Sequence, residues 1–192
     1  MANVREWYLG GMQEERKFRR VEKTVSAMDA KDVKAEDKYE ISDSLAKLLN
    51  SILADEFLAY ITYKMCEVAM VGNKQHNLVE VADDNGKDEL DDHFKNLVDW
   101  MQSKGIKVVT SVDEMAKITN CTKFTVTDGM KTSDVVDILI KSEQEAISVY
   151  EKTLDDESVK YDLRTMLSGF LKDEREHLKK LTDIRSEMRV YR

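Results

Sequence analysis

Apolar residues recur at helical spacing in four long stretches of the chain, each bounded by residues that start or stop a helix. The first stretch begins at Ser42-Asp43-Ser44, a run of residue types that cap helix N-termini, and ends before Gly72. The second stretch ends at Gly105, and the third begins after Thr132 and Ser133. The pattern predicts helices over residues of about 43–70, 74–103, 134–154 and 158–188.

The connections between these helices are short, long and short. Residues 105–132 break the helical pattern, with a β-like run at 106–109 and one small helix expected over 111–118. A connection of this length can cross from one end of a bundle to the other. The pattern therefore predicts an all-α four-helix bundle with a long crossover between helices two and three.

The residues before the bundle are strongly charged and only weakly periodic. We expect residues 1–41 to form a charged N-terminal extension and residues 42–190 to form the bundle. A basic stretch at 16–20 follows the acidic pair Glu14 and Glu15. Two interpretations stay open: a surface segment that packs on its own subunit, or an arm that binds a neighbouring subunit, another partner or a polyanion.

Composition narrows the class of protein. The chain has 192 residues, no Pro and a formal net charge of −8, which favours long helices and excludes a simple basic nucleic-acid binder. Its start has no apolar segment typical of a secretory signal, and no apolar run approaches the roughly 20 residues of a membrane span. Only Cys66 and Cys121 are present, which is typical of a reducing compartment. We therefore expect a cytoplasmic protein without a membrane partner.

Carboxylates stand on the apolar stripe of every predicted bundle helix. A buried carboxylate is costly unless it is paired or bound to a metal. One such residue is ordinary, but one on each of four helices, two of them with a nearby His, indicates a metal centre. The residues are Glu56, Glu89 with His93, Glu143, and Glu174 with His177.

For two of these residues, Glu143 and Glu89, a nearby acidic residue is an alternative candidate ligand. Glu145 lies about 160° around its helix from Glu143, so Glu143 is the better candidate. Glu89 shares a helix face with His93 four residues later. Asp92 points more to the side, yet it remains an alternative ligand in this helix.

The candidate set matches the needs of a dinuclear centre, which takes two bridging carboxylates, two terminal carboxylates and two imidazoles. Oxygen and imidazole ligands without thiolate favour iron or manganese over structural zinc. The alternative is a bundle in which these side chains face water and bind no metal. In that case Glu56→Ala and Glu174→Ala would change only the surface charge.

Three segments resemble the ferritin-like superfamily, and bacterioferritins, Dps-like proteins and rubrerythrin-like proteins are the nearest in pattern. The segments are LAKLLNSILADEFLAYITYKM, LIKSEQEAISVYEKTL and LSGFLKDEREHLKKL. The first resembles the first bacterioferritin helix, in which a metal-binding Glu is followed seven residues later by a Tyr close to the diiron site. Those positions are Glu56 and Tyr63 here, and the last segment carries the family's Glu-x-x-His as Glu174 and His177.

The second helix departs from the family pattern. The run DELDDHF places Leu90 three residues before His93, where the family has Glu. Glu89, four residues before, can still share the face if the helix has a local bulge. Bacterioferritins hold haem with a Met two residues before this His, and this chain has Asp91 there, so we expect no haem.

The resemblance implies a ferroxidase that oxidises Fe(II) with O₂ or peroxide, for iron storage or detoxification and for protection against oxidative stress. It implies two iron ions per subunit, with manganese as the other metal. Glu56 and Glu143 would be terminal ligands, Glu89 and Glu174 would bridge, and Tyr63 would hydrogen-bond the site or donate an electron. Storage would also need a homo-oligomeric cage, by analogy of twelve or twenty-four subunits.

Two other functions stay open at this point. A rubrerythrin-like peroxidase or a manganese catalase would use the same ligands with peroxide as the substrate. A Dps-like DNA-binding protein, or a cargo protein that docks into a larger shell, would use residues 1–35. Binding to DNA would weaken steeply with salt and would be lost when those residues are removed.

Overall fold

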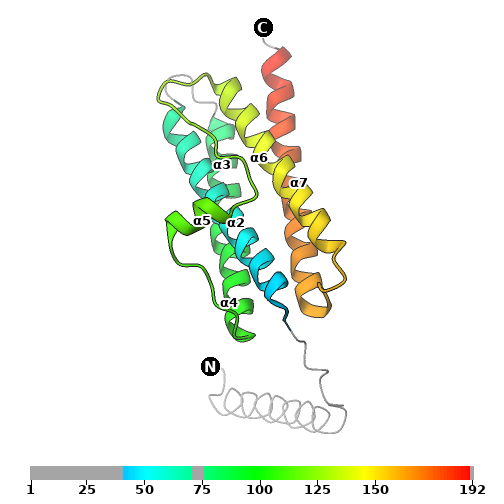
Figure 1. Cartoon of the computed structure of the whole chain (residues 1–192). Helices are drawn as coiled ribbons and strands as arrows, with labels where there is room; N and C mark the ends of the chain where they lie inside the picture. The colour runs from blue at the N-terminus through cyan, green and yellow to red at the C-terminus, as the bar shows by residue number, and fades with distance from the viewer. Residues whose placement is uncertain (1–40, 71–75, 191–192) are drawn as a thin grey trace, which may run out of the picture. The chain divides into compact units, whose positions relative to one another are not determined.

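The computed structural model describes residues 41–70 and 76–190, and in this part of the chain it contains long helices and no strand (Figure 1). Four helical segments run alongside one another, and α5 lies in the crossover between the second and the third. The elements are α2 (Asp43–Ala69), α3 (His76–Lys87), η1 (Asp88–Phe94), α4 (Lys95–Ser103), α5 (Val112–Ile118), α6 (Thr132–Leu154) and α7 (Tyr161–Val190). The predicted all-α bundle with a long crossover is confirmed. The predicted extension lies outside the described residues, apart from its last residue.

Local contacts explain where the helices begin and end. The backbone N–H of Leu45 donates to the Ser42 hydroxyl at 3.1 Å, so Ser42 is the member of the predicted capping run that caps α2. Tyr161 has a φ of 50°, and α7 begins there rather than near residue 158 because a helix does not continue through a left-handed residue. The guanidinium of Arg164 donates to the Leu154 carbonyl at 2.6 and 2.7 Å, which satisfies an acceptor at the end of α6.

The first part of the crossover is held against α2 by Asn50. The amide nitrogen of Asn50 donates to the Lys107 carbonyl at 3.0 Å, and its oxygen accepts from the Val109 N–H at 2.7 Å. The β-like run predicted at 106–109 is therefore not a strand. A side-chain amide takes the hydrogen bonds that a neighbouring strand would otherwise make.

The second part of the crossover is held by Asp55, a buried carboxylate on α2. It accepts from the Thr119 hydroxyl at 2.5 Å, from the Asn120 N–H at 2.7 Å and from the Cys121 N–H at 3.2 Å. Burial raises the pKa of Asp55, and these hydrogen bonds act in the opposite direction. Asp55 thus has a structural task, and it points away from the stripe that carries its neighbour Glu56.

The second bundle segment contains a π-helical turn, η1, between two α-helices. A π turn holds more residues than an α turn, so the buried face moves along the sequence after it. Leu97 and Met101 are buried as a result. Trp100, in contrast, is only half-buried, and its indole N–H donates to Asp162 at 2.9 Å.

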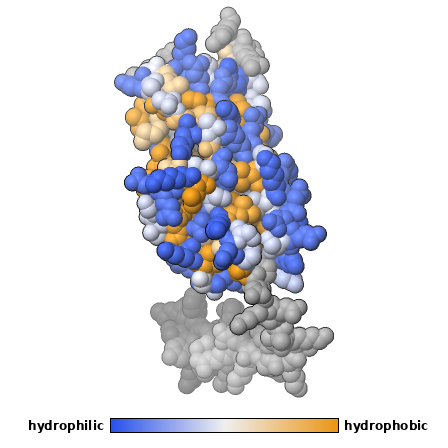
Figure 2. Space-filling model, in the orientation of Figure 1, coloured by the Kyte–Doolittle hydropathy of each residue, from blue (hydrophilic) through white to orange (hydrophobic). Residues whose placement is uncertain are grey.

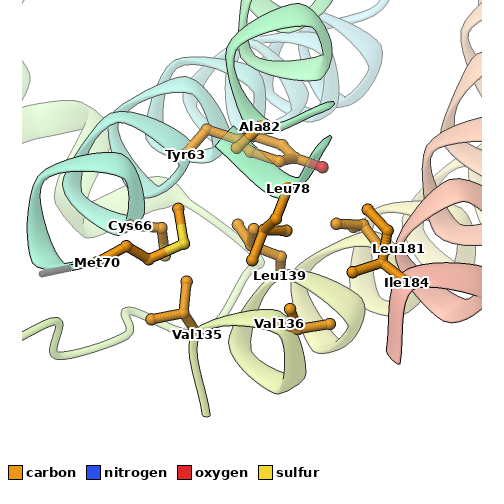
Figure 3. Close-up of a cluster of buried hydrophobic side chains, with 10 residues drawn as sticks. All are labelled: Tyr63, Cys66, Met70, Leu78, Ala82, Val135, Val136, Leu139, Leu181 and Ile184. Atoms are coloured by element: carbon orange, nitrogen blue, oxygen red, sulfur yellow. The ribbon is translucent and has the colours of Figure 1, made fainter. Parts of the chain in front are cut away.

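Apolar side chains fill the bundle on both sides of a polar centre. Towards the C-terminal end of α2, Figure 3 shows a cluster formed by Tyr63, Cys66, Met70, Leu78, Ala82, Val135, Val136, Leu139, Leu181 and Ile184. Towards the other end, the buried residues include Leu45, Leu49, Leu97, Met101, Leu163 and Leu167. Charges that lie between these layers interact strongly, because little water is there to screen them.

The surface of the bundle is mixed. Figure 2 shows hydrophilic residues over much of the visible face, with hydrophobic residues between them. Met65 and Val68 on α2 are among the exposed large apolar residues, at 50% and 73% exposure. Within the described ranges, no helix is both long enough and apolar enough to cross a membrane.

Candidate metal centre

The structure brings together all six side chains that the sequence predicts as metal ligands. Each is at most 2% exposed, and they come from all four segments of the bundle: Glu56 from α2, Glu89 and His93 from η1, Glu143 from α6, and Glu174 and His177 from α7. The competing acids lie elsewhere. Asp92 is exposed, and Glu145 accepts hydrogen bonds from the backbone and hydroxyl of Thr122.

The candidate ligand atoms form two groups that share two members. Within each group the atoms lie within 4.8 Å of one another. One group comprises Glu56, Glu89, His93 and Glu174, and the other comprises Glu89, Glu143, Glu174 and His177. Glu89 and Glu174 are thus placed to reach two ions, whereas each of the other residues is placed to reach one.

One nitrogen of each imidazole faces the carboxylates. Nδ1 of His93 lies 3.0 Å from Glu56, 3.3 Å from Glu89 and 3.4 Å from Glu174. Nδ1 of His177 lies 3.2 Å from Glu89, 3.7 Å from Glu143 and 4.0 Å from Glu174. A single ring nitrogen carries one hydrogen or one lone pair, so it cannot satisfy three carboxylates at once.

Many of the inward atoms lack hydrogen bonds. Within the described part of the chain, the inward buried atoms without a partner are both oxygens of Glu89 and of Glu174, Oε2 of Glu143 and Nδ1 of His177. The outer Nε2 of His93 also has no hydrogen-bond partner among these described residues. An unsatisfied buried polar group costs about 1–3 kcal/mol. Cations bound between these atoms would satisfy most of them together, and oxygen and nitrogen donors in this number suit a pair of divalent ions.

The π turn explains how the second segment presents its two ligands. Glu89 and His93 are four residues apart, whereas Glu174 and His177 on the regular helix α7 are three apart. The wider turn of η1 accommodates the additional residue, so both pairs point inward. This turn is a local bulge of the kind that lets Glu89 share the face of His93 despite the departure from the family pattern.

Two tyrosines bind the outer oxygens of two carboxylates. The Tyr63 hydroxyl donates to Oε1 of Glu143 at 2.5 Å, and the Tyr150 hydroxyl donates to Oε1 of Glu56 at 2.6 Å. Tyr63 is the tyrosine that the family resemblance places beside the site, and Tyr150 is a second one that the resemblance does not identify. The signal for Tyr150 is its spacing, because it follows Glu143 by seven residues just as Tyr63 follows Glu56.

Two aspartates, also missed in the sequence, lie against the outer nitrogens of the imidazoles. Oδ2 of Asp88 is 3.2 Å from Nε2 of His177, and Oδ2 of Asp173 is 3.6 Å from Nε2 of His93. At 3.2 Å the Asp88 carboxylate can hold a proton on Nε2 of His177 and leave the inner lone pair for a metal, whereas Asp173, at 3.6 Å, is an ion-pair neighbour of His93 and not its hydrogen-bond partner. Their signal is the repeated Asp-Glu dipeptide, since each Asp precedes a shared Glu.

Burial and mutual repulsion keep protons on two of the carboxylates. Burial raises the pKa of Glu56, and the nearby charge of Glu89 raises it further. Burial also raises the pKa of Glu174, with Glu89 and Glu143 adding to it. For Glu89, burial acts in the same direction, but the two neighbouring imidazoles outweigh it and lower the pKa.

The imidazoles also hold protons, because negatively charged carboxylates lie beside them. Burial alone would lower the pKa of His177, but Glu143 and Glu89 outweigh burial and raise it to about 10. The pKa of His93 is also raised by its neighbouring carboxylates, against the effect of burial. The metal-free cluster is thus a protonated network, and a metal ion has to displace protons in order to bind.

The two thiols are not among the grouped ligands of the described residues. Cys66 lies in the apolar cluster, and burial raises the pKa of its thiol to about 12. Burial and the charge of Asp55 raise the pKa of Cys121 as well. Neither side chain is a thiolate at neutral pH, so the centre offers only oxygen and imidazole donors.

Residues 46–190 match a family model described as Ferritin-like domain, and this span is more than half of the chain. No curated protein matches the sequence. Among solved structures, the chain is similar to a bacterioferritin-related protein from Bacteroides fragilis, described as a dodecameric thioferritin. The two share 19% identity over 77% of this chain and 88% of that chain, with a TM-score of 0.68.

Two further structures have the same fold. Dps from Thermosynechococcus elongatus shares 12% identity over 74% of this chain and 90% of that chain, with a TM-score of 0.68. The ferritin of M. penetrans shares 15% identity over 78% of this chain and 88% of that chain, with a TM-score of 0.62. At these identities the similarity shows the fold, and the chemistry has to be argued from the residues of the centre.

Proposed function

This chain belongs to the ferritin-like domain family, and we propose that its buried cluster is a dinuclear ferroxidase centre that oxidises Fe(II). The observation that carries the proposal is the set of inward oxygen and nitrogen atoms that have no hydrogen-bond partner within the described residues. Two of the carboxylates belong to both ligand groups, which is the arrangement that a pair of ions requires.

The residues divide between the two ions in a simple way. Glu56 and His93 would hold one ion, Glu143 and His177 would hold the other, and Glu89 and Glu174 would contact both. When bound, a pair of ferrous ions would supply the two electrons that reduce O₂ or peroxide.

Charge balance supports divalent ions in this position. With both imidazoles neutral, the four glutamates carry four negative charges, which two divalent cations neutralise. Without that balance, a buried group of like charges is costly in a medium with little water. The hydroxyls of Tyr63 and Tyr150 each hold one oxygen of a terminal carboxylate, so the other oxygen of that carboxylate is left for the ion.

We also propose that the chain assembles into a homo-oligomeric cage that stores or detoxifies iron. The related protein from Bacteroides fragilis is described as dodecameric. Met65 and Val68 expose apolar surface on α2, and assembly would bury it. Light scattering on the purified chain would measure the subunit number, and a monomer at micromolar concentration would contradict this proposal.

The ferroxidase proposal is tested by adding Fe(II) to metal-free protein in air and following its oxidation by absorbance. We expect oxidation much faster than in buffer, with saturation at about two iron ions per chain. Glu174→Ala should abolish the effect, whereas Glu176→Ala, which changes an exposed neighbour on α7, should retain it. Oxidation no faster than in buffer would contradict a ferroxidase. Rapid consumption of peroxide by the manganese-loaded protein would then favour the peroxidase or catalase alternative.

A further inference from the structure

Asn85 is a buried polar residue that the proposed ligand set does not use. It lies near the end of α3 and is 0% exposed. Its amide nitrogen donates to the Tyr63 hydroxyl oxygen at 3.1 Å, and its amide oxygen accepts from the ammonium of Lys180 at 3.3 Å. Burying an amide side chain is costly, so the presence of Asn85 here and its two hydrogen bonds indicate a specific role.

The hydrogen bonds in this chain of residues can run in only one direction. The ammonium of Lys180 has hydrogens to donate and no lone pair, so the oxygen of Asn85 must face it. The amide nitrogen of Asn85 therefore faces Tyr63, whose oxygen accepts. The single hydroxyl hydrogen of Tyr63 is then directed to Oε1 of Glu143, at 2.5 Å. Every hydrogen in the series points towards Glu143.

The packing of α3 against α2 makes this series of contacts feasible. A Cβ atom added at Gly86 would lie 3.0 Å from Cβ of Tyr63, so only a glycine permits this approach without a shift. Asn85 is the neighbour of Gly86 and is thereby brought within reach of the Tyr63 hydroxyl. At the surface, Lys180 on α7 is exposed, so the series begins with a solvated charge.

The other half of the centre lacks an equivalent. Tyr150 donates to Glu56 at 2.6 Å, but no described residue donates to the hydroxyl oxygen of Tyr150. Its ring instead meets Phe170 edge-on, with the ring centroids 6.1 Å apart and an interplanar angle of 70°. The two halves therefore have matching ligands, but only the Tyr63 hydroxyl accepts a hydrogen bond from a described residue.

We propose that Asn85 and Lys180 are positioning residues that fix Tyr63, and through it Glu143, so that one half of the centre is held more rigidly than the other. With Oε1 of Glu143 committed to Tyr63, Oε2 is presented to the ion that Glu143 and His177 share. This inference rests on the proposed function, because it takes Glu143 as a ligand. It predicts that loss of Asn85 affects one of two bound ions and leaves the other almost unchanged.

The experiment is a titration of the metal-free full chain with Co(II), followed by visible absorbance. Glu143→Ala and Glu56→Ala first identify which binding step belongs to which half. Asn85→Leu, which keeps the side-chain volume, should then weaken the step that Glu143→Ala removes by about tenfold. This is the lower end of the loss expected for a direct partner of a ligand, because Asn85 acts on Glu143 through Tyr63. Lys180→Met should weaken the same step to a smaller extent, and Lys180→Arg should restore it.

Lys179→Met is the matched control, since it removes an exposed ammonium one residue away that pairs with Asp183. It should leave both steps unchanged. The inference is overturned if Asn85→Leu weakens both steps equally or neither, with circular dichroism showing an intact helical fold. If the unmodified chain binds no Co(II) at the six ligands, the proposed function fails as well. If two ions bind but Asn85→Leu acts on both steps, only the positioning role fails.

Discussion

Glu56 and Glu143 each divide their two oxygens between a tyrosine and the centre. The outer oxygen accepts from a phenol, at 2.6 Å for Glu56 and at 2.5 Å for Glu143. The inner oxygen of Glu56 lies 3.0 Å from His93, and that of Glu143 lies 3.7 Å from His177. A carboxylate that is held at one oxygen loses rotational freedom, which prepares the other oxygen to bind.

The Tyr150 hydroxyl should therefore contribute to the stability of the metal-free protein. Tyr150→Phe leaves Oε1 of Glu56 buried without its donor, and we expect the free energy of unfolding to fall by about 1–3 kcal/mol. Urea unfolding of the metal-free chain measures this loss. An unchanged midpoint and slope would mean that the hydrogen bond contributes nothing.

The aspartates behind the imidazoles should control metal affinity without contacting the metal. Asp88→Asn removes the carboxylate that pairs with the outer nitrogen of His177 and should weaken binding by about 10–100-fold, whereas Asp173→Asn, which acts on His93 from 3.6 Å, should weaken it less. Both side chains are 44% exposed, so the variants should fold normally. Competition against a chromophoric chelator with Zn(II) measures the affinity. Asp91→Asn, on the exposed side of η1, is the control, and an equal loss in that variant would contradict the role of the other two.

At the scale of single residues, the sequence predicts the metal ligands better than it predicts the residues that lie against those ligands. Glu143 could be identified because a charge in an apolar stripe violates the pattern. Tyr150 could not, since an aromatic ring satisfies the same pattern and only its hydroxyl has a polar task. Asp88 and Asp173 could not be identified either, because in the sequence a carboxylate at the edge of a helix is indistinguishable from ordinary surface charge.

Among the elements, η1 carries the largest departure from regular helix geometry. A π turn amounts to one inserted residue, and here it lies between Glu89 and His93. Deleting Leu90, a half-buried residue inside this turn, would leave Glu-x-x-His in the sequence. The remaining residues could then form a continuous α-helix with both ligands on one face.

We expect the Leu90 deletion to keep about two metal ions per chain, because α7 already presents an equivalent pair with this spacing. Deleting Asn96 is the matched control. It removes one exposed residue from α4 and keeps the π turn, so it should turn Leu97 and Met101 out of the core and lower the Tm strongly. Co(II) stoichiometry and thermal melts measure both outcomes. Loss of all metal binding in the Leu90 deletion, with the fold intact, would show that the centre requires the π turn.

The long elements were predictable and the crossover was not. Periodic apolar residues over more than twenty positions define α2, α6 and α7, because no other structure buries them all. The course of the crossover depends on Asn50 and Asp55, whose hydrogen bonds reach residues 107–109 and 119–121 across the fold. Contacts between residues so far apart leave no periodic trace in the sequence.

Over the whole molecule, the centre makes stability depend on pH. The pKa of Glu56 is raised to about 8 and that of His177 to about 10 in the folded chain. At a pH between its pKa in the unfolded chain and its pKa in the folded chain, each group binds more protons in the folded chain. Its contribution to stability is therefore present in full below the pKa of the unfolded chain and is lost as the pH rises. The free energy of unfolding of the metal-free protein should fall as the pH rises from about 5 to about 10.

Glu89 affects stability in the opposite direction. Its pKa is lowered in the folded chain, so its contribution to stability is present above the ordinary pKa of a glutamate and is lost as the pH falls below that value, in acid. Urea unfolding of the metal-free chain at a series of pH values measures the dependence. The variant Glu56→Gln should flatten it at neutral pH, because the amide cannot ionise. A stability that rises steadily from pH 5 to pH 9 would contradict the protonated network.

Bound metal should reverse this dependence, because a divalent ion favours the deprotonated form of the same groups. A ligand that binds only the folded state adds stability as its concentration exceeds its dissociation constant, by about 2.7 kcal/mol at a hundredfold excess. Since the protons that the ion displaces are held less firmly as the pH rises, the gain in Tm on adding Co(II) should be larger at pH 8 than at pH 6. Melts at both values, with Glu174→Ala as the control that should gain little at either, measure the coupling. An equal gain at the two pH values would mean that metal binding releases no protons. The carboxylates would then have to be ionised, and the imidazoles neutral, before the ion arrives.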